Sequence, residues 1–173
     1  MDLADVIKSG KPNRPGFGKK ILVALISDFT TIQEPTGTDP GDSVKIATDH
    51  VFKTGKGFKV LETTDPKNEL TGQSVGERDS RSESQNFVCM HPGLEAEVLE
   101  FKAQSNGQDF LLLLPNLDGT YRQVGTEEDP MECTSSSGSG TKEGGYKGIT
   151  FTFTGYSPIF IYSGDIVIES AIV

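Results

Sequence analysis

The residues best suited to metal binding are two histidines, His50 and His91, in a chain of 173 residues. His50 lies in the segment TDHVF, and His91 directly precedes Pro92. Neither belongs to an H-x-H, H-E-x-x-H or C-x-x-C pattern, which are spacings that place ligands around zinc. We therefore expect no metal site, and we expect His91 to lie at the start of a helix.

Two cysteines, Cys89 and Cys133, are the candidate nucleophiles, but neither is flanked by a nucleophile signature. Cys89 stands between Val88 and Met90, so we expect a small buried apolar residue rather than a reactive thiol. The sequence GQSVG at 72–76 matches the G-x-S-x-G spacing, but it lies in a polar segment that we expect to be a loop, and not at the strand-to-helix elbow that a serine nucleophile needs. The sequence therefore predicts no enzyme, although a site assembled from scattered loop residues stays open.

Two loops resemble ligand-binding loops in composition alone. The stretch TDPGDSVKIATDH has spaced acids, but it lacks the glycine and the closing glutamate of a calcium loop in register. The stretch GSGTKEGG lacks the G-x-x-x-x-G-K-[ST] pattern and precedes a strand instead of a helix. We read both as ordinary loops and expect no cofactor.

The elements that must position any site are mostly strands. The segment 148–155, GITFTFTG, alternates strictly between apolar residues and threonine, as a half-buried strand does. The run ILVAL within 19–27 is apolar on both faces, which predicts a central strand. Further strands are expected over 80–90 and 109–125, the latter a hairpin, and FIY and DIVIE are expected to extend the same sheet.

One amphipathic helix is expected at about 92–105, with Pro92 at its first position and Asn106-Gly107 as its stop signal. Residues 44–52 and 57–63 are expected to form a hairpin, with a short helix over 44–53 as the alternative. Together these elements predict a mainly-β chain: an antiparallel β-sandwich or partly closed barrel with one flanking helix.

The domain organisation follows from composition. Residues 1–18 are rich in glycine and proline and are expected to form a flexible arm. Residues 19–173 are expected to form a single β-sandwich domain with long polar loops at 33–43, 63–79 and 126–145, the last of them mobile. The apolar run at 21–26 is too short to cross a membrane and resembles no signal peptide, so we expect synthesis in the cytoplasm and no membrane partner.

A polar strand is the clearest hint of function. The segment 79–86 has the length of a strand but hydrophilic residues on both faces, a pattern poorly specified in a monomer. Pairing between copies would explain it, and the candidate inter-subunit residues are Arg81, Glu83 and Gln85. An exposed edge strand or a plain loop is an equally good explanation.

The net charge of −9 argues against a generic nucleic-acid-binding surface, which needs clustered lysine and arginine. It does not exclude a wall that DNA passes without adhering, because acidic groups repel phosphate.

The order of elements resembles that of bacteriophage major tail, or tail tube, proteins, especially those of phages with Bacteroidetes hosts. The resemblance lies in PGLEAEVLEFKAQSNG, then DFLLLLPNLDGTYRQVG, the loop GSGTKEGGYKG and the strand ITFTFTG, and it covers roughly residues 80–164. It implies a tail-tube-like fold whose copies form stacked hexameric rings around a lumen. The partners it implies are other copies, further tail or connector proteins, and phage DNA that passes unbound through the lumen of the virion tail.

The resemblance also implies roles for the loops. Segments 1–18, 33–43 and 63–79 would make contacts between rings, with Asp65, Lys67 and Glu69 as candidate stacking residues, and strand residues such as Arg81 would line the lumen or the subunit boundary. The alternative function is a small monomeric β-sandwich module that binds a carbohydrate or a protein. The absence of tryptophan speaks against sugar binding.

Overall fold

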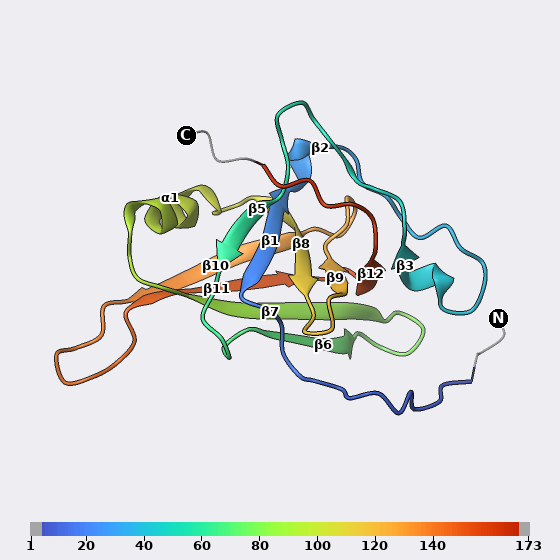
Figure 1. The fold of residues 1–173 in the computed structure, drawn as a ribbon, viewed down its shortest axis with the longest axis horizontal. Coiled ribbons are helices and arrows are strands. Elements are labelled where there is room, and N and C mark those ends of the chain that lie inside the picture. Colours follow the sequence, from blue (N-terminus) through green and yellow to red (C-terminus); the bar gives the residue numbers. More distant parts are fainter. Residues whose placement is uncertain (1–4, 170–173) are drawn as a thin grey trace.

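The computed structural model describes residues 5–169, which form a β-rich fold with one α-helix (Figure 1). The elements, in chain order, are β1 (Lys20–Leu25), β2 (Phe29–Thr31), β3 (Lys45–Ile46), β4 (Val51–Phe52), β5 (Lys59–Glu62), β6 (Glu69–Val75), β7 (Ser82–Pro92), α1 (Ala96–Gln104), β8 (Asp109–Pro115), β9 (Tyr121–Val124), β10 (Met131–Gly138), β11 (Gly148–Gly155) and β12 (Phe160–Tyr162). Two short 3-10 helices cover Ile26–Asp28 and Asp42–Val44.

Strand β8 is the centre of the fold. It pairs antiparallel with β1 on one side, and with β9 and the start of β10 on the other. Residues 110–114 of β8 and 21–24 of β1 are all buried, because each strand has a hydrophobic cluster on both of its faces. The prediction that the apolar run at 21–26 forms a central strand is confirmed.

Four long strands, in the order β10-β11-β7-β6, form the other layer of the fold (Figure 1). Their inward side chains, among them Phe87, Cys89, Phe151 and Phe153, pack against Leu112 and other inward residues of β8 and β1. The sheets do not close into a barrel. The predicted mainly-β, sandwich-like fold with a single helix is therefore confirmed.

Helix α1 begins later than the sequence predicts. Pro92 is the last residue of β7, where it pairs with Gly148, and Gly93 turns the chain with a φ of 94°. Ladder pairing with β11 therefore holds residues 91–92 in the sheet. The helix buries Val98 and packs Phe101 edge-on against Phe151, with ring centroids 5.3 Å apart. It ends before Asn106-Gly107, as expected.

The predicted hairpin between 44–52 and 57–63 is wrong, and so is the alternative of a helix over 44–53. Strand β4 pairs with β2, whereas β5 pairs with β1. The reason is an aromatic cluster: the ring of Phe29 stacks on Phe52 at 4.2 Å, and both meet Phe58. These contacts bring β2 to β4 and leave β5 free to extend the β1 ladder.

Two of the three predicted long loops are partly wrong. Segment 63–79 contains β6, whose only partly buried apolar side chains are Leu70 and Val75, so its strand character is hidden in the sequence. Segment 126–145 contains all of β10, which alternates buried Met131 and Cys133 with exposed residues. Segment 33–43 holds no strand.

The two ends of the chain add little regular structure. The arm has no helix or strand over 5–18, apart from one bridge between Phe17 and Asn116, and its first four residues lie outside the described part. DIVIE was predicted to extend the sheet, but it contributes a single bridge between Ile168 and Phe58. Among residues 5–169, no helix is long and apolar enough to cross a membrane.

Candidate assembly surface

One face of the four-strand layer is polar and points away from the core. Burial alternates along β7 and β11, so that Phe87 and Phe153 point inward while Asn86 and Thr152 point outward. We call this surface the outer face. Its polar side chains, fixed by the strand register, are Glu69, Thr71, Gln73, Ser82, Ser84, Asn86, Glu132, Thr134, Ser136, Thr150, Thr152 and Thr154.

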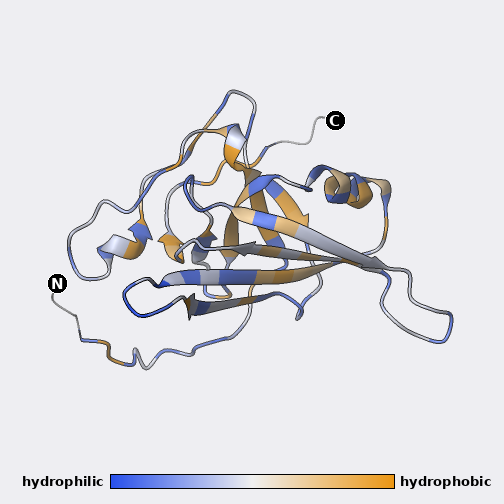
Figure 2. Cartoon of the chain, turned by 180° about the vertical axis from the view of Figure 1, so that it is seen from behind, coloured by the Kyte–Doolittle hydropathy of each residue, from blue (hydrophilic) through white to orange (hydrophobic). Residues whose placement is uncertain are grey.

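The outer face carries mainly hydroxyl and amide groups, together with the carboxylates of Glu69 and Glu132 and the apolar side chains of Val75, Val88 and Met90. Thr134 stands opposite Thr152, and Thr154 stands between Glu132 and Asn86 in one cross-strand row. No lysine, arginine or histidine from β6, β7, β10 or β11 projects from it in the described structure. Figure 2 shows the polar halves of β6 and β7 in pale and blue tones. Such a face can hydrogen-bond to water but offers no cation to a phosphate.

The four-strand layer also ends on two unpaired strand edges. Strand β6 pairs with β7 alone, and its seven residues include no proline or lysine and one charge, Glu69. At the other end, β8 pairs with only Met131 and Glu132 of β10, so no described strand pairs with the far side of residues 133–138. Proteins usually protect such edges with charge, proline or a covering segment, because a bare edge recruits another strand.

The structure separates the three candidate inter-subunit residues. Arg81 and Glu83 are exposed near the turn that joins β6 to β7, where a neighbouring molecule could reach them. Gln85 is only 2% exposed and lies under Gly72, so it is not a surface residue. Gln85 alternates along β7 with the outward-facing Ser84 and Asn86, so its side chain lies on the core side. This corrects the expectation that it meets another subunit.

The candidate stacking residues are also divided between two elements. Asp65 and Lys67 are exposed in the turn before β6, whereas Glu69 is the first residue of β6 and pairs with Val88. The sequence reasoning missed the threonines of the outer face as functional residues. The alternation in GITFTFTG carried the signal, but the partners on β6 and β10 lay in segments that we expected to be loops.

The buried side chain of His50 hydrogen-bonds to the start of the 33–43 loop and to strand β9. The Gln33 N–H donates to Nδ1 of His50 at 3.0 Å, and Nε2 of His50 lies 2.8 Å from Oε1 of Gln123. These contacts suit a neutral ring that carries its proton on Nε2. The ring also stacks on Tyr162 with centroids 4.7 Å apart.

We predict that stability falls as His50 becomes protonated. Burial lowers the pKa of His50 below its ordinary value of 6.5, although Gln123 and Asp49 act in the opposite direction. The unfolded chain then binds the proton more tightly, so stability is complete above about pH 7 and declines as the pH falls toward the folded pKa. Thermal unfolding measured between about pH 8 and about pH 5 should show this decline.

The matched variant for this prediction is His50→Gln, which keeps a polar side chain and removes the titration. The same decline in His50→Gln would contradict the assignment to His50, since carboxylates would then account for it.

The remaining candidates for chemistry are arranged as packing groups. Burial raises the pKa of Cys89 to about 12 and that of Cys133 to about 11, so both thiols stay protonated at neutral pH. His91 belongs to β7 and not to the helix start, and its Nδ1 donates to the carbonyl oxygen of Glu62. Within residues 5–169, no group of three or more His, Cys, Asp or Glu side chains is arranged to hold a metal ion.

Comparisons with family models, curated proteins and solved structures gave no match to this chain. The surfaces described above are therefore the basis for inferring function.

Proposed function

We propose that this protein is a non-enzymatic structural subunit of a phage virion, which assembles into the stacked hexameric rings of a tail tube or a related tail ring. The lumen of the rings conducts DNA at ejection. The observation that carries the proposal is the cation-free outer face, bounded on both sides by unpaired strand edges. The order of elements along the chain, which resembles that of tail tube proteins, agrees with it.

The two edges supply a geometry for assembly. The edge of β6 and the edge of residues 133–138 in β10 are different surfaces, at opposite ends of the same four-strand layer. Pairing the first edge of one copy with the second edge of the next is a head-to-tail contact, which forms a ring when the rotation closes. Four-strand layers from successive copies then join into one continuous wall.

The outer face is suited to line such a ring. DNA adheres to proteins chiefly through lysine and arginine contacts with phosphate. A wall mostly of threonine, serine and asparagine side chains, with two glutamates, Glu69 and Glu132, and a few apolar side chains such as Val88 among them, makes no such contacts and lets the duplex slide. The net charge of −9 adds a mild repulsion.

Concentration-dependent assembly is the direct test. We expect the purified protein to form rings or tubes, visible by negative-stain electron microscopy, with a rise in light scattering as the concentration increases. A particle that remains a monomer at every concentration would contradict the proposal and favour the alternative, a monomeric binding module. In such a module, the groove between α1 and β5 would be the ligand-binding site.

A further inference from the structure

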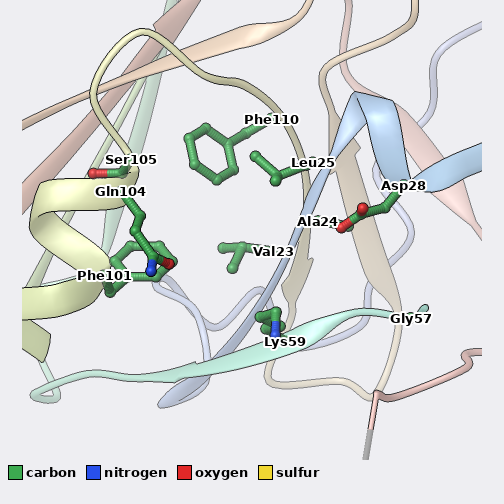
Figure 3. Close-up of a pocket in the computed structure, with 10 residues that line it drawn as sticks. All are labelled: Val23, Ala24, Leu25, Asp28, Gly57, Lys59, Phe101, Gln104, Ser105 and Phe110. Carbon is green, nitrogen blue, oxygen red and sulfur yellow. The ribbon is translucent and has the colours of Figure 1, made fainter. Parts of the chain in front are cut away.

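A groove runs between helix α1 and the edge of β5 that faces away from β1. It has a volume of about 500 Å³, and its floor is apolar, with Val23, Leu61, Val98 and Phe101. Its rim is mainly acidic and carries Glu62, Glu95 and Glu97 together with Lys59 and His91. A smaller hollow of about 70 Å³ continues it past Lys59 toward Gly57 (Figure 3). We call the two together the α1–β5 groove.

The backbone of β5 offers hydrogen bonds to this groove. The Thr63 N–H donates to Lys19 on the β1 side, whereas Phe58 and Thr64 bond to Val167 and Met90 on the other side. Backbone groups of alternate residues point to opposite sides of a strand. The N–H and C=O of Val60 therefore face the groove, and no described residue pairs with them. The open backbone is limited to Val60, because the next carbonyl on this side, that of Glu62, accepts from Nδ1 of His91.

The side chains of β5 also restrict which residues an added strand can carry. Leu61 points to the core and is 7% exposed, whereas Val60 points to the opposite face and is 40% exposed. A strand added beside β5 places consecutive side chains on these two faces in turn. Two adjacent apolar residues would therefore match the edge, followed by a cation to meet the acidic rim.

The N-terminal arm has this sequence. Val6 and Ile7 are 99% and 83% exposed, and Lys8 follows them. The arm is weakly basic in an acidic chain, since residues 1–18 carry Lys8, Lys11 and Arg14 against Asp2 and Asp5. Its described part runs away from α1, so the groove and the arm of one chain lie on opposite sides of the molecule (Figures 1 and 2).

We propose that the α1–β5 groove receives the arm of a second copy, with Val6 and Ile7 paired as an added strand beside Val60 and with Lys8 next to Glu97. The groove's apolar floor is then covered, and the open backbone of Val60 is paired. The inference rests on the proposed self-assembly and deepens it, because it names the two surfaces that hold one copy to another outside the ring wall.

Cross-linking between two tagged copies tests this contact. One copy carries Ile7→Cys, and the other carries Val60→Cys. We expect air oxidation to give a mixed dimer that a reductant dissolves, because a disulfide needs the two Cα atoms within about 7 Å. The matched control is Val51→Cys, another strand valine with similar exposure, 46%, which should cross-link to Ile7→Cys only at background level.

Two sets of substitutions should weaken the contact without harming the fold. Val6→Ser with Ile7→Ser removes two side chains that are largely exposed in the isolated chain, and it should weaken association between copies at least about tenfold. Lys8→Glu and Glu97→Lys should each weaken association by a smaller factor, and the two together should restore it.

The outcomes separate this contact from the ring. Rings that form without cross-linking at Val60 would refute the arm contact and leave the ring proposal standing. Selective cross-linking in small oligomers, with no rings at any concentration, would support the arm contact and refute the ring. Equal cross-linking at Val51 and Val60, or a link only within a single chain that carries both cysteines, would also refute the exchange between copies.

Discussion

Lysines placed on β6 should abolish ring assembly while leaving the subunit folded. We expect Thr71→Lys with Gln73→Lys to remain monomeric at concentrations where the unsubstituted protein assembles. Both residues are exposed on an edge strand. For a neighbouring strand to pair there, the two lysine side chains would have to be desolvated and would repel each other, and both costs oppose pairing. The measurement is light scattering together with electron microscopy.

The matched control places the same two charges on a different exposed strand. Thr30→Lys with Thr31→Lys changes β2, which belongs to the small two-stranded sheet with β4. We expect this variant to assemble normally, and both variants to unfold within about 0.5 kcal/mol of the unsubstituted protein. Assembly that survives the β6 lysines would show that this edge is not part of the contact.

The largest effect on stability is expected from Phe151→Ala. The Phe151 ring is fully buried on β11 and lies between the core and helix α1, where Phe101 meets it edge-on. Truncation leaves a cavity and removes this contact, so we expect a loss of about 3–5 kcal/mol in the free energy of unfolding. Chemical denaturation monitored by circular dichroism measures it.

The neighbouring residue supplies the control. Thr152 follows in the same strand but points to the outer face, so Thr152→Ala should change the free energy of unfolding by no more than about 0.5 kcal/mol. A similar loss from both substitutions would contradict the assignment of the two faces. The pair therefore also tests which side of the four-strand layer is available to line a lumen.

Some strands carry a clear local signal in the sequence, whereas others do not. The alternation in 148–155 and the doubly apolar runs of β1 and β8 are local signals, so their strands and burial could be predicted. Strand β6 escaped because an edge strand needs few apolar residues, and Leu70 is the only one that it packs on the core. Local pattern is weakest where a strand meets solvent on most sides.

The candidate surfaces were less predictable than the core. Gln85 was expected at a subunit boundary because its segment is polar, yet the β7 register turns it inward beneath Gly72. The outer face draws its side chains from four strands spread over residues 69–154, so no single segment contains its pattern. The α1–β5 groove likewise depends on where the helix packs, and no spacing in the chain specifies that.

The sequence by itself determined the mainly-β class, the central place of the apolar runs and the single helix, because these follow from the periodicity of neighbouring residues. Only the tertiary structure decided which strands pair, where Pro92 and Gln85 lie, and which threonines share one face. Pairing depends on contacts between distant segments, such as Phe29 with Phe52, and these are settled by how well side chains pack once the chain has collapsed.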